Sequence, residues 1–308
     1  MIKYVVKRLI ALIPVIIGVT MLVFFILKSA PGDPVRLILG EQATPEQIAA
    51  LTEQMGLDQP LLAQYAKYMV GLLQGDLGIA YSTRRPVADE VFSRFPYTLK
   101  LSLVATVVSI ALAIPLGIIA AVKQNTVIDN VSMFVALIGI SMPMFWLALL
   151  LMLLFSLKLG WFPVSGAASW SSYVLPAFAL GFMNMASTAR TTRSSMLETI
   201  RQDYIRTARS KGVSNSVVIR KHAFKNALIP TITVCGLQIG SLLGGSVLCE
   251  TVFAWPGIGR LMVQAISARD VPMVLGCTVI FTICFSIVNL LVDLLYGFVD
   301  PRIKSMYS

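Results

Sequence analysis

Charged and hydrogen-bonding side chains gather in one segment of the chain, residues 190–226, which holds nine of the 25 lysines and arginines. Its central stretch, RTARSKG at 206–212, combines guanidinium, ammonium and hydroxyl donors and ends on a glycine. The segment lies between two long apolar runs, so it is interpreted as a loop of a membrane protein. It is large enough to fold, and the chemistry that we expect of it is contact with another surface.

Catalytic and metal-binding patterns are missing from the rest of the sequence. A single histidine, His222, excludes a histidine-based metal site. The four cysteines share no CxxC spacing, so we interpret them as small apolar fillers rather than as zinc ligands or a disulfide framework. They are Cys235, Cys249, Cys277 and Cys284. The chain has no GxxxxGK[ST] loop for ATP and no GxSxG nucleophile motif. If the protein pumps, its energy must enter through another protein.

Composition predicts an all-helical membrane protein, because 56% of the 308 residues are apolar and only 13% are charged. Six apolar runs are long enough to cross a bilayer. They are 9–27, 101–122, 131–157 with Pro143 inside, 161–189 with a helix from about Tyr173, 227–249 and 271–292. The first run is long for a cleaved signal peptide and indicates an anchored helix. Apart from Asp293, one residue past the sixth run, the spans contain almost no ionisable residues, so ion-coupled transport by this chain alone is the less favoured alternative.

Charge asymmetry gives the orientation. With the N-terminus inside, the inner segments hold fifteen lysines and arginines with a net charge of +11, whereas the outer segments have a net charge of zero. Excess Lys and Arg marks the cytoplasmic side, so both termini and the 190–226 segment are predicted to be cytoplasmic. The overall charge of +10 is then explained by basic loops and needs no nucleic acid. Residues 31–100 would lie outside, with Thr44, Pro45 and Gln47 forming a helix start of the capping-box type.

Helix signals divide the charged segment into two short amphipathic helices. Ser195 and Glu198 fit a capping box that would start the first helix, and Gly212 would end it as a C′ residue with positive φ. An apolar stripe is predicted from spacings of three and four residues. Its members are Leu197, Ile200, Tyr204 and Ala208. The second helix would run from Asn215 or Ser216 to Lys225. Such helices suit docking into a groove on another protein, and resting on anionic lipid headgroups is the alternative.

Two further stretches carry a recognisable pattern. Gly236, Gly240 and Gly244 recur every four residues, so they form one small-residue helix face that serves internal packing, an interface or a pathway lining. Gln238 in the same helix is a candidate polar contact to a path. In the external segment 250–272, the PGIG stretch after Trp255 predicts a helix break that lies at the membrane interface, dips into the bundle or forms a surface turn. The candidate residues there are Trp255, Pro256, Gly257 and Gly259.

RTARSKG, followed by RKHAFKNALIP at 220–230, resembles the cytoplasmic loop of binding-protein-dependent ABC importer permeases of the dipeptide/oligopeptide branch. The general signature there is EAA, three residues, Gly, nine residues and I-x-L-P. Aligned on Gly212, only Ala208 matches the EAA triplet, and Pro230 follows five residues later than the signature gives. Other stretches that resemble the family span the chain. They are PGDP at 31–34, GDLG at 75–78, Arg85-Pro86-Val87 with Glu90, WPGIG at 255–259, Arg269-Asp270 and DPRI at 300–303.

The resemblance implies the type I ABC importer permease fold, with one helix at 1–30, an external region at 31–97, a five-helix domain at 98–299 and a cytoplasmic tail at 300–308. It implies a multi-pass subunit of a prokaryotic inner membrane that pairs with a second permease. Two ATPase subunits would bind ATP and magnesium and dock on the loop, and this chain would carry neither catalytic residues nor a cofactor. An extracytoplasmic binding protein would deliver the ligand.

The implied contact residues in the loop are Arg206, Thr207, Ala208, Arg209, Lys211 and Gly212. Arg206 stands where the usual signature has Glu, which leaves the chemistry of that contact open. Short peptides are the expected ligand, with glutathione as the runner-up and nickel or metal chelates as a further option. A membrane scaffold without transport is the third class of function.

Overall fold

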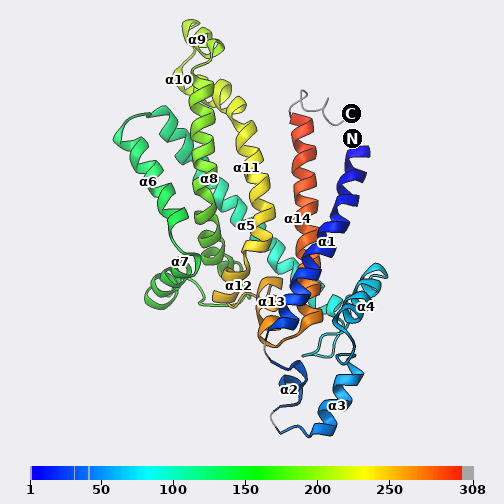
Figure 1. The fold of residues 1–308 in the computed structure, drawn as a ribbon. Helices are drawn as coiled ribbons and strands as arrows, with labels where there is room; N and C mark the ends of the chain where they lie inside the picture. Colours follow the sequence, from blue (N-terminus) through cyan, green and yellow to red (C-terminus); the bar gives the residue numbers. More distant parts are fainter. Residues whose placement is uncertain (1, 31, 41, 300–308) are drawn as a thin grey trace. The chain divides into compact units, whose positions relative to one another are not determined.

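The computed structural model describes residues 2–30, 32–40 and 42–299. The predicted cytoplasmic tail at 300–308, with its DPRI stretch, lies outside the described residues. Within them the regular elements are helical, apart from an isolated antiparallel bridge between Ile79 and Pro86, as composition predicted (Figure 1). The helices are α1 (Ile2–Ser29), α2 (Pro34–Leu39), α3 (Pro45–Gln54), α4 (Leu61–Leu73), α5 (Val87–Val122), α6 (Val127–Ser141), α7 (Met144–Leu151), α8 (Val174–Ile200), α9 (Asp203–Ser210), α10 (Asn215–Val217), α11 (Phe224–Gly245), α12 (Val247–Val252), α13 (Ile258–Ser267) and α14 (Val271–Val299). Single π-helical segments, Met152–Lys158 and Val218–Ala223, follow α7 and α10, and a 3-10 turn, Trp170–Tyr173, precedes α8.

Four of the described helical segments are long and apolar enough to cross a membrane: Tyr4–Ser29, Val87–Val122, Asn215–Gly244 and Val271–Leu294. A fifth candidate is the broken pair Val127–Ser141 and Met144–Lys158, whose two halves are bent by 104°. Helix α8 is 27 residues long but has a polar second half, TARTTRSSMLET, and it is not among these candidates. The number of spans is thus four or five by length and composition, and six spans stay a prediction.

The run at 131–157 is not one continuous helix. Pro143 is extended, with φ −62° and ψ 135°, and it forms the N-cap of α7. Because proline lacks an N–H and disfavours the helical conformation of the residue before it, the helix ends at Ser141 and restarts at Met144. The 104° bend is the structural consequence of a proline that the sequence showed inside an otherwise uniform apolar run.

The described chain forms two compact units, and the first contains residues 99–255 and 287–299. Helix α8 is its central element, because α5, α6 and α11 each contact α8. Small residues allow the close approaches. A Cβ atom added to Gly117 of α5 would lie 2.6 Å from Thr192 Cβ, and one added to Gly139 of α6 would lie 2.6 Å from the Phe182 carbonyl oxygen.

The second unit contains residues 2–98 and 256–286. Its buried core combines the 77–91 segment with α13 and the start of α14, and includes Leu77, Val87, Ile258, Leu261, Met273, Val274 and Cys277. A second contact fixes α4 to α1, since the Tyr65 hydroxyl donates to the Ile17 carbonyl at 2.9 Å and lies 3.0 Å from Thr20 Oγ1. The predicted capping box at Thr44 and Gln47 is confirmed, with both reciprocal hydrogen bonds formed.

Candidate docking site

Helix α9 is an eight-residue helix that ends in a glycine turn. Gly212 has φ 77°, and its N–H donates to the Arg209 carbonyl at 3.0 Å. The Val213 N–H reaches back to the Ala208 carbonyl at 3.3 Å. These two bonds satisfy the last carbonyls of α9 in the way that left-handed glycine turns do, so the predicted C′ role of Gly212 is confirmed.

The predicted start of the loop helix is wrong. Ser195 and Glu198 lie inside α8, which continues to Ile200, and α9 begins at Asp203 after the N-cap Gln202. Met196 is fully buried and Ser195 nearly so, so tertiary packing keeps this turn helical where the local capping signal favoured a break. The second loop helix likewise does not stop at Lys225, because helical backbone continues from Asn215 to Gly244.

Helix α9 is anchored by the side chain of Ile205, which is fully buried. Ile205 belongs to an apolar cluster at the base of the loop, with Ala121, Met196, Val218, Ala223 and Ala227. Leu197, Ile200 and Ala208 of the predicted stripe are partly buried against this cluster. Tyr204 is instead 44% exposed, and its hydroxyl accepts a hydrogen bond from Asn226 at 2.9 Å. Sequence reasoning missed Ile205 because the stripe was extended across the break at Arg201–Gln202, where the helical period restarts.

The outer surface of α9 is basic and exposed. Arg206, Thr207, Arg209 and Lys211 are all exposed, and Ala208 is half-buried beside them. Arg206 lies 3.8 Å from the Asp203 carboxylate, a pair whose side chains are 78% and 98% exposed. Exposed pairs of this kind contribute little to stability. The helix therefore presents donors to solvent while its position is fixed from beneath, and with α10 it lies at one end of α8 and α11 (Figure 1).

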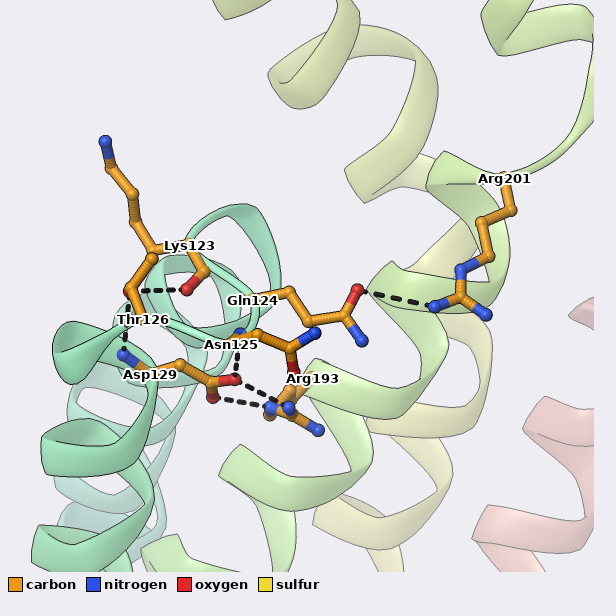
Figure 2. Close-up of polar contacts among 7 residues, drawn as sticks. All are labelled: Lys123, Gln124, Asn125, Thr126, Asp129, Arg193 and Arg201. Carbon is orange, nitrogen blue, oxygen red and sulfur yellow. Dashed lines mark hydrogen bonds and ion pairs between the residues drawn. The ribbon is translucent and has the colours of Figure 1, made fainter.

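A partly buried ion pair, with a buried carboxylate and a partly exposed guanidinium, lies near the base of the loop (Figure 2). Arg193 of α8 donates from Nε and from its terminal nitrogen to the two carboxylate oxygens of Asp129, each at 2.7 Å. The Asp129 side chain is 3% exposed and also accepts the Asn125 N–H at 3.1 Å. A longer contact, 3.3 Å from Arg201 to Gln124, joins the same two parts of the chain. Bidentate pairs are strong and directional, and removing one partner of a buried pair is costly.

The sequence carries a signal that Asp129 has a partner. Asp129 is the only acidic residue between Glu90 and Glu198. An isolated carboxylate beside long apolar runs is expected to have a specific cationic partner. Distance along the chain, 64 residues, hid which of the loop arginines that partner is.

Gln238 has both ends of its amide engaged by α8. Its Nε2 donates to the Asn184 carbonyl at 2.8 Å, and its Oε1 accepts from the Thr188 hydroxyl at 3.0 Å. In the glycine face on the same helix, a Cβ atom on Gly236 would lie 2.5 Å from Val292 Cγ2, whereas one on Gly244 would meet nothing within 4 Å. Gly240 is buried. This arrangement serves helix packing at Gly236 and Gln238.

We expect the Gln238→Leu variant to lose about 1 kcal/mol of stability, because the Thr188 hydroxyl and the Asn184 carbonyl each lose a partner. The measurement is thermal unfolding in detergent. Thr233→Ala is the matched control, since Thr233 is half-buried like Gln238 and its hydroxyl donates to the Ile229 carbonyl of its own helix. A Gln238→Leu variant as stable as this control would contradict the packing role.

The Trp255–Gly259 stretch interrupts the helical chain, as predicted, but slightly earlier than its PGIG letters suggested. Helix α12 ends at Val252 and α13 begins at Ile258, so Gly259 lies in the first turn of a helix. Trp255 is fully buried, with its ring 4.5 Å from that of Tyr173 at 77°. In the second unit, Ile258 is also fully buried, and its N–H donates to Thr98 Oγ1 at 2.9 Å. A plain surface turn would leave these residues exposed, so that alternative is wrong.

Comparison with known proteins identifies the family. Residues 113–305 match the family of the binding-protein-dependent transport system inner membrane component, and residues 1–102 match the N-terminal family of the same membrane components. The dipeptide transport system permease protein DppB of Alkalihalophilus pseudofirmus is 45% identical over 332 residues, covering 99% of this chain and 100% of the relative. The glutathione transport system permease protein GsiC of Escherichia coli K12 is 46% identical over 304 residues, covering 99% of both chains.

Solved structures support the fold. An inward-facing structure of the MetNI methionine ABC transporter matches with a TM-score of 0.58 and 18% identity, over 68% of this chain and 95% of that one. An amino acid ABC transporter crystallised with histidines matches with a TM-score of 0.55 and 15% identity, over 68% of this chain and 94% of that one. The match of both segments and the near-complete coverage by peptide-type permeases agree with each other. The chain therefore belongs to the family of binding-protein-dependent transport system inner membrane components, the permease subunits of bacterial ABC importers.

Proposed function

We propose that this chain forms one half of the translocation pathway of an ATP-driven importer of short peptides. The identity of 45–46% to dipeptide and glutathione permeases over nearly the whole chain supports this ligand class, with glutathione as the alternative and metal chelates as a more distant one. ATP would be bound and hydrolysed by two partner subunits, because the sequence has no GxxxxGK[ST] loop. A second permease and an extracytoplasmic binding protein would complete the assembly.

The observation that carries the proposal is the construction of α9. Its apolar side is held by the buried Ile205, and its basic side is exposed at Arg206, Arg209 and Lys211. A helix that is fixed from beneath and open above suits docking into a groove on an ATPase, since little conformational entropy is then lost on binding. Movement of the docked ATPases would be transmitted to α8 through Ile205 and the apolar cluster around it. Gly212 sets the direction in which the chain leaves the contact.

The topology that fits this function has six spans. Helix α8 would be the remaining one, with its polar residues turned toward the bundle, where Thr188, Thr192 and Ser195 are buried. Excess positive charge would place both termini and the α8–α11 connection in the cytoplasm. Residues 31–97 would then face the binding protein on the opposite side, ahead of the five-helix domain at 98–299 and the tail at 300–308.

Charge reversal on α9 tests the docking directly. In the variant Arg206→Glu/Arg209→Glu/Lys211→Glu, Ile205 and Gly212 are kept, so the helix should stay in place while its exposed surface changes sign. We expect the co-expressed ATPase subunits to be lost on affinity purification of the variant from detergent-solubilised membranes. The matched control reverses two exposed cations of the 31–97 segment, Arg36→Glu/Lys67→Glu, and should retain the ATPases.

Three outcomes would contradict the proposal. Undiminished co-purification of the ATPases with the α9 variant would exclude docking through this surface. A second contradicting result would be that the parent protein binds anionic lipid through this loop, and that the α9 variant loses this lipid binding but keeps its ATPases. The surface would then be assigned to lipid headgroups. Uptake into liposomes driven by an ion gradient, without any ATPase subunit, would support a secondary transporter. The ligand that co-purifies with the partner binding protein would separate peptides from glutathione and metal chelates.

A further inference from the structure

The Asp129–Arg193 ion pair lies outside the docking surface on α9. It joins the first turn of α6 to α8, two turns before α8 ends at Ile200 (Figure 2). Both carboxylate oxygens of Asp129 accept from the Arg193 guanidinium at 2.7 Å, and the Asn125 N–H binds one of them at 3.1 Å. Asn125 itself has φ 61°, so the turn before α6 adopts a conformation that is uncommon for a residue with a side chain.

Further along, α6 and α8 also meet through apolar side chains. Ala136 of α6 packs in a cluster with Met185, Ala186 and Ala189 of α8. Further along, Gly139 approaches the Phe182 backbone closely. Packing of small apolar side chains fixes how near two helices lie, but it is non-directional. The bidentate ion pair is directional, so it is the contact best suited to set the axial register of α6 on α8.

The buried contacts that hold α9 in place also reach α8 close to Arg193. Ile205 belongs to one buried cluster with Met196 of α8, and Met196 is three residues from Arg193. A displacement of α9 would therefore act on α8 within one helical turn of the ion pair. From Arg193 the contact passes to Asp129 and hence to α6, which the bend at Pro143 separates from α7.

We propose that Asp129 and Arg193 are a positioning pair, which makes α6 move with α8 when α9 is displaced. This inference rests on the proposed function for the origin of the displacement. The link itself is a property of this chain alone. The pair would transmit a displacement of α9 to the bent α6–α7 segment. The apolar cluster that contains Ile205 includes no residue of α6 or α7 among those described.

The first test measures the link without any partner. Spin labels would be placed on Val131→Cys of α6 and Ser210→Cys of α9, two exposed positions, in a Cys284→Ala background, since the other three cysteines are buried. We expect one narrow distance distribution in the parent. In the apolar variant Asp129→Leu/Arg193→Met, which leaves no buried charge unpaired, we expect a broader or shifted distribution. Arg36→Met, which removes the exposed Asp33–Arg36 pair, is the control and should change nothing.

The second test measures coupling in the complete transporter, reconstituted with its ATPases and binding protein. The apolar double variant should retain its ATPases and hydrolyse ATP, while uptake of a labelled dipeptide, or of labelled glutathione if that is the probe transported, falls at least about fivefold per ATP, the lower end of typical coupling effects. Asp129→Asn and Arg193→Gln alone should lose coupling to a similar extent, and the double variant should be no worse than either, because each single change already breaks the same link.

The outcomes separate this inference from the proposed function. Unchanged spin–spin distances in the double variant, or unchanged uptake per ATP, would overturn the positioning role. A general loss of folding would appear as loss of ATPase association as well, and the apolar double variant is chosen to avoid it. Absence of ATPase binding to the parent protein would refute the proposed function and would leave the distance measurement as a valid test of the link.

Discussion

The Gly117→Ala variant is expected to unfold well below the temperature of the parent protein, with a loss of about 3 kcal/mol of stability. A single added methyl carbon would lie 2.6 Å from Thr192 Cβ and 2.7 Å from the Ala189 carbonyl oxygen. Both of these atoms are fixed by the backbone of α8, so no side-chain rotation can relieve the overlap. Helix α5 must move away from α8, and the apolar contacts on either side of Gly117 are lost with it. Thermal unfolding in detergent measures the effect.

The control makes the same substitution where no neighbour lies close. A Cβ atom on Gly18 of α1 would meet nothing within 4 Å. Alanine is the better helix former by up to about 1 kcal/mol, so Gly18→Ala should be neutral or slightly stabilising. The two variants thus differ in the sign of their effect, although the chemical change is identical. Equal stabilities for Gly117→Ala and Gly18→Ala would show that α5 and α8 are not in close contact.

These glycines show what the sequence could and could not predict. Long apolar runs and the low charge content predicted an all-helical membrane protein, because lipid leaves unpaired backbone groups without partners. A glycine in such a run is compatible with packing, bending or mere tolerance, and the sequence does not distinguish these. The regular spacing at Gly236, Gly240 and Gly244 drew attention, yet Gly244 has open space around it. Gly117, Gly139 and Gly181, which follow no simple repeat, make the close backbone contacts.

The loop shows a similar division. Local turn chemistry predicted Gly212, because a positive φ at the end of a helix is a property of a few neighbouring residues. The start of α9 was missed because it depends on Met196, whose burial keeps α8 helical beyond the Ser195–Glu198 signal. The Asp129–Arg193 pair could not be predicted from the sequence for a related reason. An isolated acid indicates that a partner exists, but only the packing of α6 against α8 selects Arg193 from nine basic residues.

The Asp270→Ala variant is expected to lose about 3 kcal/mol of stability, through the loss of a helix cap and of two further hydrogen bonds. Asp270 is fully buried in the second unit. Its Oδ1 caps α14 by accepting the Met273 N–H at 3.2 Å, and its Oδ2 accepts from the Ser82 N–H at 2.9 Å and the Ser82 hydroxyl at 2.7 Å. One carboxylate therefore fixes both the start of α14 and the turn at residues 80–85. Burial of the Tyr81 hydroxyl, together with the negative charge of the Asp270 carboxylate, raises the pKa of Tyr81 to about 12.

Asp270→Asn separates charge and acceptor number from shape. Its amide group is isosteric, but with Oδ1 kept for the cap its NH₂ would face the Ser82 N–H, and two donors cannot bond each other. We therefore expect Asn to lose most of the stability that Ala loses. Ser82→Ala, which removes only the hydroxyl donor, should lose about 1 kcal/mol. In the double variant Asp270→Ala/Ser82→Ala, the loss should be smaller than the sum of the two single losses, since both changes remove one shared bond.

A local readout tests whether the effect arises in this turn. Arg84 is exposed, has φ 58° and lies two residues after Ser82, so trypsin can report on the turn by cleaving after it. Release of the turn in Asp270→Ala should speed this cleavage, because the open form becomes more populated when its free energy relative to the closed form falls. Thr83→Ala, at an exposed neighbouring position, is the matched control. Equal cleavage rates in the two variants would mean that Asp270 stabilises α14 alone, and the turn would need another anchor.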